Sequence, residues 1–159
     1  MTSTNAVIGA SGKTGRRVAD LLEERGHAVR RLARGTTPPF DWEQPHGWPQ
    51  ALAGVDRLYA AYVPDIAAPG SDVAITRLTE VARDAGVRHI VLLSGRGEAS
   101  ARRVEDILFA SGVPATVVRS SWFLQNFTEG MLRDAVLTGV LAMPAGDVRE
   151  PFILSLIHI

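Results

Sequence analysis

The sequence predicts an α/β fold built on a doubly wound parallel sheet, and three observations lead to this prediction. Short apolar runs of strand length alternate with segments whose apolar residues recur at helical spacing. A glycine-rich turn at residues 9–15 joins the first apolar run directly to the first helical segment. Glycines follow several helical segments, where a C-terminal cap is expected. Alternating strands and helices form crossover units, which place parallel strands side by side beneath helices.

The first half of the chain predicts two helices among four strands. In the first helix, Val18, Leu21 and Leu22 lie on one face, and Gly26 closes it. The predicted elements are a strand at 5–9, a helix at 14–25, a strand at 27–33, a short strand at 40–42, a brief helix at 48–52 and a strand at 55–63.

The second half continues the alternation. Ser71 is the expected N-cap of a helix that Gly86 closes. The run 87–93 is apolar almost throughout, which is typical of a strand buried on both faces. The predicted elements are a helix at 71–85, a strand at 87–93, a helix at 100–110, a strand at 115–118, a long helix at 121–137 and a last short strand at 138–143.

Composition narrows the classes of function. The 17 Lys and Arg residues balance 17 Asp and Glu residues, and no basic block occurs, so we expect no nucleic-acid partner. The chain has no cysteine and its four histidines are scattered, which disfavours disulfides, thiol catalysis and a metal site. No signal-peptide pattern begins the chain and no apolar run approaches the length of a membrane span. A cytoplasmic protein of one domain with a sizeable core is therefore expected.

The glycine turn has the layout of a dinucleotide site. Gly9 allows a tight turn after the strand, Gly12 lets the backbone approach a pyrophosphate, and Gly15 lets the helix pack close to the strand. The helix that follows offers free N–H groups and a partial positive charge to phosphates. The alternative is an ordinary loop between a strand and a helix. A P-loop is disfavoured, because Lys13-Thr14 precedes a glycine and the first glycine of that pattern is missing.

Arg34 follows the second predicted strand, where an acidic residue would bind the ribose 2′-hydroxyl of NAD. A guanidinium there can bind a 2′-phosphate through two hydrogen bonds. NADP is therefore favoured, with NAD as the alternative cofactor. Arg30 and Arg31 are expected to belong to a solvated strand edge rather than to the site.

Four stretches together resemble the NmrA-like group of atypical short-chain dehydrogenases, a Rossmann-like NAD(P)-binding family. They are Gly9–Gly15, Phe40-Asp41-Trp42, Val91–Ser94 and Arg119–Phe127, and the resemblance covers nearly all of residues 4–153. The nearest branch resembles the bacterial relatives of ergot-alkaloid dehydrogenases, which are often described as NAD(P)H-dependent quinone or azo reductases. In such proteins the cofactor lies over the first glycine turn.

The resemblance implies roles for individual residues. Ser11, Lys13 and Thr14 would face the phosphates, Arg34 would meet the 2′-phosphate, and Asp41 would lie near the adenine. The remaining residues would lie nearer the nicotinamide: Ala61, Tyr62 and Ser94 along the path toward it, and Ser120 and Trp122 beside nicotinamide and substrate.

Some of these residues also have a purely structural interpretation. Aromatic burial favours a core position for Trp122, Phe123 and Phe127 over a substrate wall. Ser94 would then be only a hydroxyl at a strand end.

The chain departs from the wider family at the catalytic pair. Ordinary short-chain dehydrogenases use Tyr-x-x-x-Lys as acid–base pair, but the matching helix begins Ala101-Arg102-Arg103-Val104-Glu105. The proton donor is therefore unassigned. Glu105 is expected to be a surface charge. Quinone or azo reduction could proceed without a protein acid, because water can supply the proton.

The C-terminus departs as well. By resemblance, family members continue beyond Phe152 with a substrate-side region. We therefore expect residues 1–153 to form an NAD(P)-binding domain that is truncated before that region. The tail 154–159 reads Leu-Ser-Leu-Ile-His-Ile, which matches a translation of the mosaic end of a common sequencing transposon. A non-native tail is expected, with a native apolar tail as the alternative.

The sequence thus predicts an NADP-dependent oxidoreductase that transfers hydride to a small quinone-, azo- or imine-type acceptor. The alternative is a redox-sensing regulator that binds NAD(P) and a partner protein without turnover.

Overall fold

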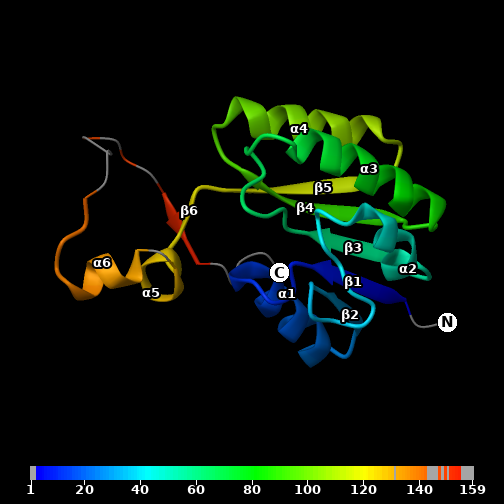
Figure 1. Ribbon diagram of the computed structural model, residues 1–159, viewed down its shortest axis with the longest axis horizontal. Coiled ribbons are helices and arrows are strands. Elements are labelled where there is room, and N and C mark those ends of the chain that lie inside the picture. Colours follow the sequence, from blue (N-terminus) through cyan, green and yellow to red (C-terminus); the bar gives the residue numbers. More distant parts are fainter. Residues whose placement is uncertain (1–2, 131, 143–146, 148, 150, 155–159) are drawn as a thin grey trace.

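A computed structural model describes residues 3–130, 132–142, 147, 149 and 151–154 (Figure 1). Five parallel strands form the sheet in the order β2-β1-β3-β4-β5. Their bounds are β1 Thr4–Ile8, β2 Ala28–Leu32, β3 Arg57–Ala60, β4 His89–Gly95 and β5 Ala115–Ser120. The order reverses between β1 and β3, and the carboxyl ends of these two strands therefore flank the crevice in which open α/β sheets bind ligands. The predicted fold class is confirmed.

Helices cover the two faces of the sheet unequally. The longer helices are α1 Lys13–Glu24, α3 Ser71–Asp84 and α4 Ala99–Ala110, joined by the short η1 Pro45–Gly47 and α2 Trp48–Leu52. Residues of α2, α3 and α4 share one core with the sheet, while α1 packs on the opposite face (Figure 1). The described helices do not exceed 14 residues, and none of them could cross a membrane.

The β4 strand is buried mainly on one face, so the prediction of burial on both faces was wrong. Ile90, Leu92 and Ser94 are buried toward the α3 and α4 side, whereas Val91 and Leu93 are only partly buried. The apolar pattern did not distinguish these environments, because both faces carry aliphatic side chains.

Residues 40–42 form no strand, contrary to expectation. Phe40 stacks on Trp48 with ring centroids 5.2 Å apart, and Trp42 meets Phe40 edge-on at 5.1 Å. The Trp48 Nε1 donates to the Asp41 carbonyl at 2.7 Å. Aromatic packing and side-chain hydrogen bonds thus fix this segment in place of a ladder. A smaller correction concerns α3, whose N-cap is Gly70 rather than the predicted Ser71.

The predicted long helix at 121–137 is broken into three elements. They are the strand β6 Trp122–Phe123, the helix α5 Asn126–Glu129 and the helix α6 Arg133–Leu137. Strand β6 pairs with β7 Phe152–Ile153. Gly130 ends α5 in an extended conformation, and a Cβ there would be crowded, 3.0 Å from the Asn126 carbonyl oxygen and 2.9 Å from the Lys13 Nζ.

Two predictions concern the C-terminal residues, a strand at 138–143 and a non-native tail at 154–159. The described residues 138–142 form no strand, so that prediction was wrong, and Met143 lies outside the described residues. Of the tail at 154–159, only Leu154 is described.

Replacing Gly15 by Ala should destabilise the fold. A Cβ at Gly15 would lie 2.3 Å from the carbonyl oxygen of Gly9, so α1 would have to move away from β1. We expect a loss of about 3 kcal/mol in the free energy of unfolding, measured by urea denaturation. The control is Gly47→Ala, where the added Cβ meets nothing within 4 Å. It should change stability by less than about 0.5 kcal/mol. Equal stability of the two variants would contradict the close approach.

Candidate functional site

The glycine turn leaves the beginning of α1 open to a ligand. Gly9 adopts φ +79°, and its N–H donates to the Leu32 carbonyl at 3.0 Å. Gly12 is the N-cap of α1, and no side chain caps the helix there. The first N–H groups of an uncapped helix need acceptors from elsewhere. A Cβ at Gly12 would also come within 3.2 Å of the Gly9 carbonyl oxygen. The turn can therefore admit an anion close to the backbone.

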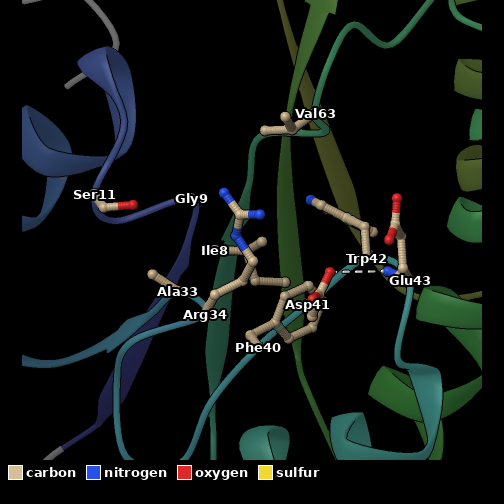
Figure 2. A pocket seen from close by; sticks show the side chains of 10 residues that line it. All are labelled: Ile8, Gly9, Ser11, Ala33, Arg34, Phe40, Asp41, Trp42, Glu43 and Val63. Carbon is tan, nitrogen blue, oxygen red and sulfur yellow. Dashed lines mark hydrogen bonds between the residues drawn. The ribbon is translucent and has the colours of Figure 1, made fainter.

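A cavity of about 180 Å³ lies beside this turn, and we call it the turn cavity. It brings together Gly9, Ser11, Arg34 and Asp41, four of the predicted cofactor-binding residues. Figure 2 shows the Arg34 guanidinium pointing into the space between the glycine turn and Val63. The remaining lining residues are Ile8, Ala33, Phe40, Trp42, Glu43 and Val63.

Arg34 differs from the two arginines before it. Arg31 pairs with Asp20 at 2.6 Å and with Glu23 at 2.7 Å, and these carboxylates raise the pKa of its guanidinium. Arg30 donates to the backbone carbonyls of α2 and the residue after it. Arg34 is exposed and makes no hydrogen bond or ion pair with the part of the chain that the structure describes. Of the three, only Arg34 is thus placed to meet a ligand.

Asp41 lies where the turn cavity meets a second hollow. One carboxylate oxygen accepts the Glu43 N–H at 3.1 Å, the dashed line in Figure 2. Asp41 and Arg34 also line an adjoining cavity of about 170 Å³ together with Gln44 and His46. Both side chains therefore face space that a ligand could enter.

Lys13 and Thr14 are engaged inside the protein. The Lys13 Nζ donates to the Asn126 Oδ1 at 2.7 Å, which ties α1 to α5. Thr14 is buried and hydrogen-bonds the side chain of Tyr59, whose pKa is raised by burial. Neither side chain points freely into the turn cavity, and their expected contacts with phosphates remain predictions.

Arginines of α1 reinforce this tie to α5. Arg17 forms a bidentate pair with Glu129, and Arg16 reaches the same carboxylate at 3.4 Å. The hydrogen bond from Arg17 lowers the pKa of Glu129. Figure 1 shows α5 and α6 beyond the carboxyl ends of the strands, with α5 on the side of α1 and α6 farther out.

A second cavity of about 160 Å³ opens at the carboxyl ends of β3, β4 and β5, and we call it the strand-end cavity. It brings together Tyr62, Ser94 and Ser120, which the sequence placed on the nicotinamide side. Its other lining residues are Pro64, Asp65, Ile66, Leu93, Gly95, Glu98, Ser121 and Phe123. Sequence reasoning missed Glu98, although its place just beyond the end of β4 was a usable signal.

Ala61 and Trp122 occupy different places. Ala61 is buried beneath the glycine turn, and its carbonyl accepts the Trp42 indole N–H at 3.2 Å. Trp122 does not line the strand-end cavity; it is 37% exposed and packs near Phe152. Phe123 and Phe127 also lie outside the two buried cores, so the expected core position of these three aromatics was wrong.

Glu105 is buried, and the prediction of a surface charge was wrong. Its side chain is 2% exposed; both of its oxygens share the Arg119 Nε–H, and Oε2 also accepts from Arg119 Nη2. Ser94 Oγ donates to Glu105 Oε1 at 2.6 Å. The Arg119 hydrogen bonds, with a smaller contribution from Ser94, lower the pKa of Glu105. A helical pattern could not reveal this burial, because the partner arginine comes from β5.

The proton of the Ser94 hydroxyl is therefore directed at Glu105. Toward the strand-end cavity the oxygen can offer only lone pairs. Ser94 is thus more than a hydroxyl at a strand end: a buried carboxylate holds its proton, and its oxygen is left able to accept a hydrogen bond from the cavity side. No cluster of three or more His, Cys, Asp or Glu side chains that could bind a metal occurs among the described residues.

The chain is similar in sequence and in fold to known proteins. No protein-family model matches the chain. The chain is 25% identical to prestalk A differentiation protein A of Dictyostelium discoideum, covering 89% of this chain and 52% of that protein. It is 30% identical to festuclavine dehydrogenase of Aspergillus fumigatus, over 79% of this chain and 49% of that enzyme. The chain spans about half the length of these curated relatives.

Solved structures share the fold. The NADPH-dependent quinone oxidoreductase of Escherichia coli, complexed with NADPH, superposes with a TM-score of 0.69. It is 22% identical, over 90% of this chain and 57% of that one. The triphenylmethane reductase of Citrobacter sp., complexed with NADP(H), gives a TM-score of 0.66 at 20% identity, over 97% and 61%.

The Glu105 carboxylate should stabilise the protein in a pH-dependent way. Glu105→Gln removes the charge that Arg119 meets, and we expect a loss of about 2 kcal/mol at neutral pH. Because the folded-state pKa is lowered, the contribution is complete above the ordinary value of 4.5 and is lost as pH falls through the folded-state value. Urea unfolding at several pH values measures it.

Glu24→Gln is the matched control, since Glu24 is exposed at the end of α1. The difference in free energy of unfolding between wild type and Glu105→Gln should shrink in acid. A difference that stays constant into strong acid would contradict the pairing of Glu105 with Arg119.

Proposed function

Because this chain belongs to the NmrA-like, short-chain dehydrogenase type of Rossmann-fold NAD(P)-binding proteins, we propose that it is an NADP-dependent oxidoreductase. One observation carries the proposal: the uncapped beginning of α1 and the unpaired Arg34 guanidinium flank the same cavity. A dinucleotide with a 2′-phosphate has anionic groups for both. We further propose that residues 1–153 act as one cofactor-binding domain.

The residues present fit such a cofactor. The pyrophosphate would lie at the helix N-terminus over Gly12, where no side chain obstructs the backbone. Arg34 would hold the 2′-phosphate, and Asp41 would lie on the adenine side. The strand-end cavity, lined by Tyr62, Ser94 and Ser120, would take the nicotinamide end.

Charge favours NADP over NAD. The described lining of the turn cavity has Arg34 just after β2, where an NAD-binding site would have a carboxylate. A guanidinium offers two parallel hydrogen bonds to a phosphate. The quinone oxidoreductase and triphenylmethane reductase structures, which contain NADPH and NADP(H), support this choice.

When bound, the reduced nicotinamide would supply a hydride. The chain's own residues would bind the cofactor, orient it through the glycine turn and Ser94, and place a small quinone-, azo- or imine-type acceptor beside it. The likeness to an NADPH-dependent quinone oxidoreductase supports the quinone among these acceptors.

A redox-sensing regulator is the second candidate. Its support is the helix start Ala101–Glu105, which lacks the Tyr-x-x-x-Lys pair, together with the likeness to a differentiation protein. Such a protein would bind NAD(P) and a partner protein without turnover.

Turnover separates the two candidates. We expect the chain to oxidise NADPH when quinones, azo dyes or cyclic imines are offered. The loss of NADPH absorbance measures this oxidation. Clear NADPH binding in titration calorimetry without oxidation by any acceptor would favour the regulator instead.

Arg34→Asp tests the choice of cofactor. It replaces the proposed partner of the 2′-phosphate by a group that repels it, so the Kd for NADPH should rise about 100-fold or more. The Kd for NADH should change less than about threefold. Arg30→Asp is not a clean control, because Arg30 bonds backbone carbonyls. Arg25→Asp, an exposed arginine at the end of α1, serves that purpose. Equal losses for both cofactors would contradict the assignment.

A further inference from the structure

The strand-end cavity has an unpaired polar atom that the proposed cofactor site leaves unexplained. Ser121 Oγ is buried and finds no hydrogen-bond partner among the described residues, although its residue lines the cavity. A buried hydroxyl without a partner costs stability unless something supplies one. Because Ser121 lines the strand-end cavity, a polar group that enters the cavity is one candidate partner for this hydroxyl.

Glu98 brings a carboxyl group to the same place. It is the N-cap residue of α4, and its carboxyl lies over the backbone of Gly95 at the end of β4. A Cβ at Gly95 would lie 3.2 Å from the Glu98 carboxyl carbon and 3.2 and 3.3 Å from its oxygens. The glycine thus leaves room for the carboxyl against the end of β4, one residue beyond Ser94.

We propose that the strand-end cavity holds the hydride acceptor next to the nicotinamide end of the cofactor, and that Glu98 gives the acceptor the proton that completes its reduction. This inference rests on the proposed oxidoreductase function and assigns the proton donor that the missing Tyr-x-x-x-Lys pair leaves open. Ser121 would hold the acceptor in place, donating the hydrogen bond that its Oγ lacks in the structure.

The other groups in the cavity are less suited to giving a proton. Ser94 directs its hydroxyl proton at Glu105, whose charge Arg119 holds. Tyr62 packs edge-on against Trp42, with ring centroids 4.9 Å apart, and is the rival donor.

The surroundings of Glu98 make its carboxyl a weaker acid than usual. Although the residue is exposed, partial burial of the carboxyl raises its pKa above the ordinary value of 4.5, and the nearby charge of Asp65 raises it further. The described lining of the cavity contains no Lys or Arg to oppose this effect. Ser94 from β4, Ser120 at the end of β5, Ser121 just after it and Tyr62 after β3 face the same space.

The chemical step balances as follows. One end of the acceptor's double bond gains the hydride, its π electrons move to the oxygen or nitrogen at the other end, and that atom takes the Glu98 proton. The O–H bond of the carboxyl breaks, leaving a carboxylate that water protonates again. In sum, acceptor, reduced cofactor and one proton give the reduced acceptor and the oxidised cofactor.

The test compares three variants with the unaltered chain. Glu98→Gln should lower NADPH oxidation about 100-fold and remove the fall in rate that deprotonation causes as pH rises. Asp65→Asn should move that fall to lower pH, because it removes a like charge near Glu98. Glu80→Gln, at an exposed position on α3, should change neither the rate nor its pH dependence. NADPH binding should be the same in all four proteins.

A second measurement needs no cofactor. With carbon-13 in the glutamate carboxyls, NMR titration of the chain alone should show a resonance that titrates above the ordinary range. Glu98→Gln should abolish that resonance, and Asp65→Asn should move its midpoint to lower pH. Titration of Glu98 in the ordinary range, unmoved by Asp65→Asn, would overturn the inference.

The outcomes separate the inference from the function beneath it. If the unaltered chain turns over and Glu98→Gln matches it at every pH, the inference fails while the oxidoreductase stands. Loss of the pH dependence in Tyr62→Phe instead would make Tyr62 the donor and overturn the role of Glu98. If the unaltered chain binds NADPH but reduces no acceptor, the proposed function fails, and the inference fails with it.

Discussion

The close approach of α1 to the end of β1 is the constraint on which the rest of the site depends. Gly15 lies so near the Gly9 carbonyl that no side chain fits between them. This contact aims the beginning of α1 at the crevice between β1 and β3, where the strand order reverses. The turn cavity on one side and the strand-end cavity on the other both take their positions from that crevice. A helix set farther from the sheet would turn its free N–H groups away from both.

Much of this arrangement could be predicted from local sequence. The glycine spacing, the alternation of apolar runs and the position of Arg34 each depend on residues close together in the chain. The five-stranded sheet and its long helices therefore appear where periodicity puts them, within a few residues at each end. The gathering of Gly9, Ser11, Arg34 and Asp41 around one cavity follows from the same topology.

What escaped prediction depends on contacts between distant residues. Glu105 reads as a surface charge on a helix until Arg119, 14 residues later, reaches it from β5. The stretch after Ser120 reads as one helix, but β6 pairs with β7, thirty residues later in the chain. Gly130 also ends α5 where a side chain would be crowded by Asn126 and Lys13. Helical periodicity says nothing about a partner residue from another strand or about the space around a backbone atom. Those two factors determine the structure at these positions.

The hydrogen bond between Lys13 and Asn126 couples the two ends of the described fold. Lys13 stands at the beginning of α1, where a phosphate would attract it, yet its ammonium already serves α5. A bound dinucleotide and the docked C-terminal segment would thus compete for, or share, a single cation. Thermodynamic linkage makes any such coupling reciprocal: a cofactor that draws Lys13 away loosens α5 by the same free energy with which a docked α5 weakens the cofactor. Arg17 and Glu129 bear on this balance, because they keep α5 beside α1 when Lys13 turns elsewhere. The chain's lone lysine therefore lies where binding at the glycine turn can change the stability of the segment that follows the sheet.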